Sequence, residues 1–244
     1  MTGEMSAADV GWAAGLMERR RQVYAGYSPV FWRPAEGAAG LHEQFLRRQV
    51  RSEAAVALRT RHGFIICERR QPEALVDDFT VAPPGTWGTD GAALLLAAAA
   101  RLAAGGISAV RVVTAHADQA KAGMLTGLSL SLSEQWWVRE LRPAGQPAAP
   151  GRASGPGFSG TLGPAPPVYD PGGLVFQADQ AGSHSDAGAI ARGAEALGAV
   201  LAVIPAAPGT AFSSTLSQEG WTVASDWYLG WPREHHPQEP AGPR

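Results

Sequence analysis

The strongest constraint on the fold is a repeat, because the second part of the chain restates elements of the first in the same order. The tryptophan-containing segment 133–138, Ser-Glu-Gln-Trp-Trp-Val, aligns with 224–229, Ala-Ser-Asp-Trp-Tyr-Leu. Other aligned positions keep this order at an offset of ninety-odd residues: Phe79 with Phe176, Gly91-Ala92 with Gly188-Ala189, Ala109-Val110 with Ala199-Val200, and Gly127 with Gly220. Such self-similarity predicts two structurally related units.

Helical spacing and short apolar runs predict one order of elements in the first unit and a shortened form of it in the second. In the first unit the expected helices are 7–27, 39–51, 91–104 and 118–126, and the expected strands are 54–59, 63–68, 74–81, 109–115 and 128–141. In the second unit the expected strands are 174–178, 199–204 and 221–231, and the expected helices are 186–197 and 211–218. This order predicts an α/β (α+β) fold, with a mixed central sheet flanked by helices and a smaller half-domain after it.

The proposed boundaries follow changes in composition. Residues 1–141 form the first domain, 142–166 a Pro/Gly-rich linker that is flexible or extended, 167–232 the truncated repeat and 233–244 a polar tail. Because the second unit lacks the two leading helices and the strand pair, we expect it to be a structural or capping partner. The protein would then be a monomer with a pseudo-dimeric repeat, or a homodimer.

Composition excludes several classes of protein. The net charge of -2 carries no general nucleic-acid footprint, and no apolar run is long enough to span a membrane. The N-terminus has no export signal, so a cytoplasmic protein is expected.

Cys67, the single cysteine, is predicted to be a buried structural thiol, and His235-His236 lacks the further ligands of a metal site. The arginines of the first seventy residues, among them Arg19-Arg20-Arg21, are usually a solvated helix face and less often an anion site.

The junction from Val76 to Leu96 has two interpretations. A strand with two aspartates runs through a Pro/Gly loop into a Leu/Ala-rich helix. Such a helix start aims backbone N–H groups and the positive end of the helix dipole at one point, which suits a pyrophosphate. The alternative is an ordinary N-cap by Thr86 or Thr89, with Asp90 favouring the same dipole. The N–H groups available to a phosphate would be those of Trp87, Gly88, Thr89, Gly91 and Ala92.

Residues 81–95, VAPPGTWGTDGAALL, resemble the signature region of the GNAT superfamily of acyl-CoA-dependent N-acyltransferases. Val81, Pro83, Gly91 and 93–95 match the pattern, whereas Thr86 replaces its Gln or Arg and Thr89 its middle glycine. The resemblance covers about residues 7–141, with a weaker echo from 167 to 231. It implies transfer of an acetyl group from acetyl-CoA, with CoA as product, to a small-molecule or peptide amine. The cofactor-binding residues it implies are Phe79, Val81, Thr86, Trp87, Gly88, Thr89, Gly91 and Ala92.

The resemblance also implies chemical roles. A carboxylate on or near the signature strand would act as base, and strand alternation allows only one of Asp77 and Asp78 to face the cleft. The tyrosine that serves the family as acid is replaced by Gly123, and His116 is the candidate substitute. Aromatic residues of the region between the leading helices would wall the acceptor site: Tyr24, Tyr27, Phe31 and Trp32. The missing signature residues favour an alternative function, a binding or regulatory module on the same fold with little or no catalysis.

Overall fold

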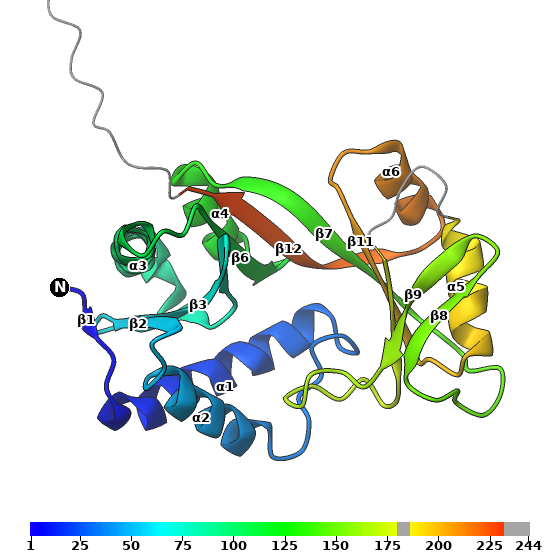
Figure 1. Cartoon of the computed structure of the whole chain (residues 1–244), viewed down its shortest axis with the longest axis horizontal. Helices are drawn as coiled ribbons and strands as arrows, with labels where there is room; N and C mark the ends of the chain where they lie inside the picture. Colours follow the sequence, from blue (N-terminus) through cyan, green and yellow to red (C-terminus); the bar gives the residue numbers. More distant parts are fainter. Residues whose placement is uncertain (180–185, 232–244) are drawn as a thin grey trace, which may run out of the picture.

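Strands of both units join in one continuous sheet in the computed structural model, which describes residues 1–179 and 186–231 (Figure 1). The order of strands across the sheet is β1-β2-β3-β4-β6-β12-β7-β11-β10-β9-β8, with β5 also paired to β3. The strands are β1 (Gly3–Glu4), β2 (Ala55–Arg59), β3 (Gly63–Arg70), β4 (Glu73–Val76), β5 (Phe79–Val81), β6 (Ala109–Ala115), β7 (Ser131–Glu140), β8 (Gly151–Gly155), β9 (Phe158–Gly163), β10 (Val175–Ala178), β11 (Leu201–Ala206) and β12 (Thr222–Gly230). The helices are α1 (Val10–Tyr27), α2 (Ala38–Gln49), α3 (Ala92–Ala104), α4 (Gln119–Gly127), α5 (Ala187–Ala196) and α6 (Ala211–Gln218).

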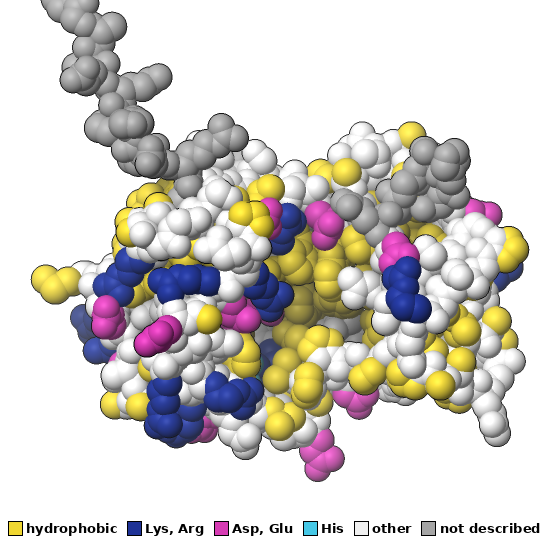
Figure 2. Space-filling view, in the orientation of Figure 1, with side chains coloured by type: hydrophobic (Ala, Val, Ile, Leu, Met, Phe, Trp, Pro, Cys, Tyr) yellow, Lys and Arg dark blue, Asp and Glu magenta, His cyan; other side chains and the backbone are white. Residues whose placement is uncertain are grey.

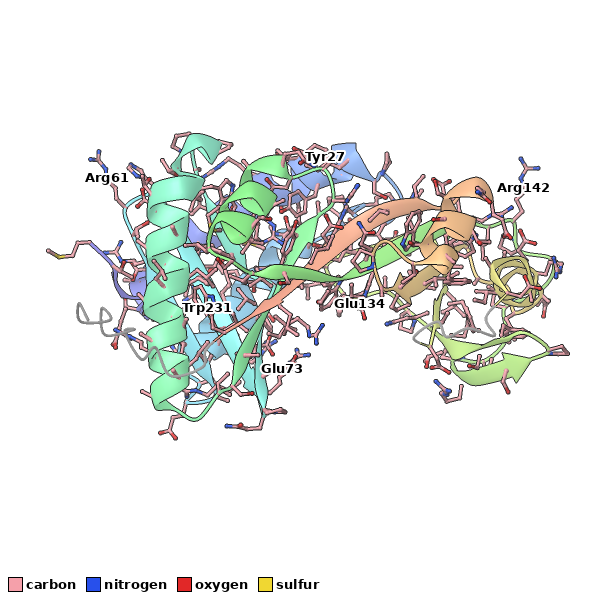
Figure 3. The ribbon with its side chains drawn as sticks, turned by 90° about the horizontal axis from the view of Figure 1, so that it is seen from above. Tyr27, Arg61, Glu73, Glu134, Arg142 and Trp231 are labelled. Carbon is pink, nitrogen blue, oxygen red and sulfur yellow. The ribbon has the colours of Figure 1, made fainter. Side chains whose placement is uncertain are left out.

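The two units exchange strands at the centre of the sheet. Strand β12 of the second unit lies between β6 and β7, and β7 of the first unit lies between β12 and β11. The pairing is the same from either end: a parallel pair, β4–β6 or β10–β11, is followed by an antiparallel neighbour from the other unit. Figure 3 shows Glu134, on β7, between the units, with Arg61 at one end of the molecule and Arg142 toward the other.

The exchanged strands place the aligned positions of the repeat side by side. Gln135 is the register partner of Asp226, its predicted equivalent. The indole rings of Trp136 and Trp227, also predicted equivalents, stack with centroids 4.7 Å apart and an interplanar angle of 28°. The sheet therefore has the approximate two-fold order expected of a duplicated unit.

The prediction of a linker over 142–166 is wrong where β8 and β9 form an antiparallel hairpin. Gly157, at φ +77°, lies in the turn between them, and Gly160 admits no side chain because a Cβ there would lie 2.3 Å from the Gln177 carbonyl oxygen. These glycines serve a turn and a close strand contact. The second unit therefore has a strand pair, contrary to expectation, and lacks only the leading helices.

The first unit has helices on both faces of its sheet. Alternation along β3 turns Phe64 and Ile66 toward α1 and α2, and Ile65 and Cys67 toward α3. In the second unit α5 and α6 cover one face, where they pack with Phe176, Ala202 and Ile204. The opposite face of the second unit is covered only in part, by the connection between α1 and α2. Cys67 is buried, as predicted.

The predicted third strand, 74–81, is interrupted at Asp77 and Asp78, which separate β4 from β5. No described helix is both long and apolar enough to cross a membrane. The tail 233–244, with His235-His236, and residues 180–185 of the second unit lie outside the described residues.

Candidate functional site

The break at Asp77 and Asp78 marks the point where two neighbouring strands separate. Strand β4 pairs with β6 as far as Val76, opposite Val112. Beyond the break, β5 continues along β3 through Phe79, Thr80 and Val81, while β6 pairs with β12 on its other side. The sheet therefore opens into a gap between β5 and β6, and both aspartates stand at its start.

The two aspartates have different environments. Asp78 is buried, and its Oδ1 lies 3.3 Å from Nε2 of the buried His42 on α2. Burial acts to raise the pKa of Asp78, but the charges of His42 and the nearby arginines outweigh it and hold the pKa below its ordinary value. The Asp77 side chain is 53% exposed and faces a cavity. Asp77 is thus the aspartate that faces the cleft.

Lys121, the one lysine of the sequence, occupies the gap between β5 and β6. It is fully buried on α4, and its Nζ donates to the carbonyl oxygens of Val113 (2.7 Å) and Phe79 (3.3 Å). The rings of Phe79 and Trp87 lie 5.2 and 5.5 Å from the same nitrogen. Burial, with the charge of Arg20, holds the pKa of Lys121 well below its ordinary value. The lysine therefore ties the separated strands together.

Arg20 and Tyr24 of α1 enter the same region from the opposite face. Arg20 donates from Nη1 to the carbonyl oxygens of Asp77 (2.8 Å) and Phe79 (3.2 Å). The Tyr24 hydroxyl donates to Oδ2 of Asp118 at 2.8 Å, and burial raises the pKa of Tyr24. The solvated helix face expected of the arginine run is wrong for Arg20 and Arg21, which are both buried.

The loop after β5 is already helical. A 3₁₀ turn (Pro84–Thr86) and a π turn (Trp87–Gly91) lead into α3. These turns use N–H groups that were predicted to bind phosphate: Trp87 donates to Pro84, and Ala92 donates to Thr89 and Trp87.

The predicted N-cap is also wrong. The Thr86 and Thr89 hydroxyls donate back to the carbonyl oxygens of Pro83 and Thr86, and neither caps an N–H group. The Asp90 carboxylate lies 3.1 Å from Nδ1 of His62.

Two glycines of the loop have different surroundings. A Cβ on Gly91 would lie 2.6 Å from the indole of Trp87, so Gly91 lets that ring pack against Phe79, 4.9 Å away between centroids. A Cβ on Gly88 would meet nothing within 4 Å. Glycine at position 91 is therefore explained by packing, whereas the backbone at Gly88 is open to an approaching group.

Asp77 faces a largely apolar cavity of about 280 Å³ that both units line. Figure 2 shows the hollow of hydrophobic side chains between the two halves of the molecule. The first unit contributes Phe31, Trp32, Leu75, Asp77, Val113 and Trp136; the second contributes Thr161, Gly163–Pro166, Tyr169, Pro171, Val175, Gln177, Leu201, Val203, Ser225 and Trp227. The second unit, expected to be a structural or capping partner, therefore also lines this cavity.

The four aromatic residues predicted to wall an acceptor site separate into three groups. Phe31 and Trp32 line the cavity, and their rings meet edge to face with centroids 4.6 Å apart. Tyr24 is buried beside Trp32, with its hydroxyl directed at Asp118. Tyr27 is 46% exposed at the end of α1 and does not line this cavity (Figure 3).

Solved structures with a similar fold cover nearly all of the chain. A candidate acetyltransferase from Thermoplasma acidophilum aligns over 95% of this chain and 100% of its own, at 8% identity and a TM-score of 0.61. A GCN5-related N-acetyltransferase from Sphaerobacter thermophilus aligns over 94% of both chains, at 11% identity and 0.58. A tandem GNAT protein from the clavulanic acid biosynthesis pathway covers 94% of this chain and 97% of its own, at 11% identity and 0.51. The chain has the tandem GNAT fold.

This GNAT fold confirms the predicted fold class. No protein-family model and no curated protein sequence matches the chain. At identities of 8 to 11% the structural likeness establishes the fold and leaves the chemistry to be argued from this chain's own residues.

The second unit of this GNAT fold has an aspartate in the position of Asp77. Asp179 follows β10 directly, as Asp77 follows β4. These strand ends set a different correspondence from the predicted alignment of Phe79 with Phe176. Its carboxylate accepts from Arg152 Nη2 (2.8 Å) and Ser159 (2.7 Å), and the bond from Arg152 lowers the pKa of Asp179 to about 2. Asp77 has one longer contact, 3.5 Å from Arg20 Nη2. Only the first unit therefore presents a loosely held carboxylate at this position.

The structure does not bring His116 together with Asp77. The His116 Nδ1 lies 2.9 Å from Oδ2 of Asp226, whose hydrogen bond raises the pKa of His116. Ser225 and Trp227, on either side of Asp226, line the cavity, so alternation places Asp226 on the other face of the sheet.

The sequence analysis did not assign four residues to the candidate site: Lys121, Tyr169, Trp136 and Trp227. The sequence contains one hint of Lys121: every other Lys or Arg position of the chain is an arginine, and the one lysine follows β6. Tyr169 lies in the segment assigned to the second unit's start, and only the tertiary fold brings it to Trp32, with centroids 5.3 Å apart.

Proposed function

We propose that the protein is an acyl-CoA-dependent N-acetyltransferase whose acceptor amine binds in the cavity shared by the two units. The observation that carries this proposal is the position of Asp77. It stands at the opening between β5 and β6, more than half exposed, and faces a cavity with aromatic walls. A carboxylate in such a place can hold an ammonium group and take a proton from it.

The remaining roles follow from position. Acetyl-CoA, when bound, supplies an acyl group activated as a thioester, which passes to the amine nitrogen with release of CoA. The residues that would hold it are the backbone of Gly88, Thr89 and Gly91, with Trp87, Ala92 and Thr86 beside them and Phe79 and Val81 along β5. Of these, the open backbone at Gly88 fits a phosphate group best. His116 beyond β6, whose pKa is raised, is the candidate to donate a proton to a leaving thiolate, because burial disfavours the protonated form of Lys121.

One observation favours a second function, an amine-binding module without acetyl transfer. The gap in which a thioester would reach Asp77 contains Lys121 and the Trp87 ring from one face and Arg20 from the other. Acetyl transfer requires Lys121 to leave the carbonyls of Phe79 and Val113, whereas a binding module would keep the gap closed.

A thiol-release assay with acetyl-CoA and a panel of amines separates the two functions. We expect turnover that Asp77→Asn reduces by at least about a hundredfold, the usual size of a general-base effect. The matched variant Asp179→Asn changes the equivalent carboxylate of the second unit and should leave the rate within about twofold. Calorimetry with CoA reports cofactor binding separately. Absence of both CoA binding and thiol release would leave the binding module as the function.

A further inference from the structure

The cavity combines one negative charge with an apolar, aromatic interior. Among its lining residues the only carboxylate is that of Asp77. The polar neighbours are neutral: Thr161, Gln177, Ser225 and the Tyr169 hydroxyl. No lining residue is a lysine or arginine. A ligand that fits this surface has one positive charge and a body without charged groups.

Arg20 is the cation that could cancel Asp77, yet its geometry leaves the carboxylate available. The guanidinium is buried, donates to two backbone carbonyls at 2.8 and 3.2 Å, and lies over the Tyr24 ring. Its contact with the Asp77 carboxylate is 3.5 Å and uses one oxygen. Arg20 does not line the cavity, so a ligand meets the carboxylate and not the guanidinium.

The walls are supplied by aromatic side chains of both units. Trp32 and Tyr169 meet at 5.3 Å, with Phe31 against Trp32, while Trp136 and Trp227 stack on the sheet. Aromatic faces favour cations by cation–π attraction and favour flat apolar groups by packing. The volume of about 280 Å³ lies at the lower limit for small-molecule sites and suits a ligand of one ring and a short chain.

From these features we infer that the cavity selects a small primary aralkylamine, with its ammonium at Asp77 and its ring among the aromatic walls. Polar polyamines and peptides are disfavoured, because their further charges and amide groups would lie against apolar surface without partners. The inference names the substrate class of the proposed transferase and in that sense rests on the proposed function. As a statement about binding it does not need acetyl-CoA.

The test measures amine binding without CoA, by tryptophan fluorescence and calorimetry, with 2-phenylethylamine as the probe. Three tryptophans line the cavity and report its occupancy: Trp32, Trp136 and Trp227. We expect saturable binding at about millimolar concentration or below. Spermidine replaces the ring with a chain that carries further ammonium groups, and 3-phenylpropionate keeps the ring but replaces the ammonium with a carboxylate. Both should bind at least about tenfold more weakly than 2-phenylethylamine, since a tenfold change in affinity corresponds to one modest interaction.

Two variants test whether the Asp77 carboxylate binds the ammonium group. Asp77→Asn keeps the shape of a half-exposed side chain and should weaken 2-phenylethylamine binding at least about tenfold. Glu73→Gln removes a carboxylate from β4, the strand that Asp77 follows. Glu73 pairs with Arg111 and does not line the cavity, so this change should leave the affinity unchanged.

Filling the cavity tests its walls. Val175→Phe, on β10, should abolish binding while the thermal unfolding transition is kept. Gln177→Phe, on the same strand, should do the same and provides a second variant if the first does not fold.

The possible outcomes separate this inference from the proposed function. Amine binding that depends on Asp77, without thiol release from acetyl-CoA, would support the amine site and remove the transferase. No saturable binding of 2-phenylethylamine, tighter binding of spermidine, or equal binding of 3-phenylpropionate would each overturn the aralkylamine site, whatever the transfer assay reports.

Discussion

The two units share an order of strands but differ in what stands at the end of their parallel pairs. In the first unit β4 ends at the loosely held Asp77, and the gap beyond it contains Lys121. In the second unit β10 ends at Asp179, whose carboxylate is satisfied by Arg152 and Ser159 of the β8–β9 hairpin. Both units therefore have the same order of strands, but only the first has an aspartate at this position that is free to contact a ligand.

The absence of leading helices in the second unit has a use in this arrangement. Where α1 and α2 cover the first unit, the corresponding face of β10 and β11 remains partly open and forms a wall of the cavity. The second unit is therefore part of the candidate acceptor site, although it has no such site of its own among the described residues.

Removal of β12, the strand that the second unit contributes to the first, should have the largest effect on stability. A chain ending at Gly220 leaves β6 and β7 without their shared neighbour. We expect loss of cooperative unfolding, because the net stability of a domain is typically only about 5–15 kcal/mol and two strand pairings of the central sheet are removed. Urea unfolding followed by circular dichroism measures this. A chain ending at Trp231, which keeps every described strand, should unfold cooperatively. If the chain ending at Gly220 does so too, the first unit folds without exchange.

A smaller effect is expected at the stacked tryptophans. Trp136→Ala and Trp227→Ala should each cost about 3 kcal/mol, and their effects should be non-additive by about 1 kcal/mol because the rings stack. A double-mutant cycle in urea measures the coupling. Trp12→Ala, which removes a ring packed on Phe64, should combine additively with Trp136→Ala. Additive effects of the central pair would mean that the two units are not coupled through this stack.

The smallest expected effect is a pH dependence of the free energy of unfolding, caused by Lys121 in the gap between β5 and β6. The pKa of Lys121 is lowered in the folded protein, so at a pH between this lowered pKa and about 10.5 only the unfolded chain binds the extra proton. Native stability therefore rises with pH across that window. Relative to Lys121→Met, the native chain should gain at most about 1.4 kcal/mol per pH unit, measured by urea unfolding from pH 7 to 9. Arg61→Met, an exposed control, should show no such trend. A flat difference would show that Lys121 is charged in the gap.

Local patterns predicted the elements of this fold well. The strand 109–115 and the helix 211–218 have the predicted bounds, because each has a clear apolar pattern between turn residues. The hairpin of β8 and β9 was missed, since its glycines, used for a turn and a close contact, also typify a linker. Strand exchange was not predictable, because pairing between distant strands leaves no local signal.

The candidate site was only partly predictable for the same reason. Asp77 and Asp78 were identified as a pair, but which one faces the cavity depends on His42, which lies on a different element, α2. Phe31 and Trp32 line the cavity, while most of its wall comes from residues more than one hundred positions further along the chain.

The position of β12 also has a consequence for synthesis of the protein. A ribosome makes β6 and β7 long before β12, the strand that lies between them. Two edges of the first unit therefore stay unpaired while residues 141–221 are synthesised. Exposed strand edges are templates for association with other chains. Slow translation or slow release should therefore favour pairing between two nascent copies, with β12 of one chain entering the sheet of another.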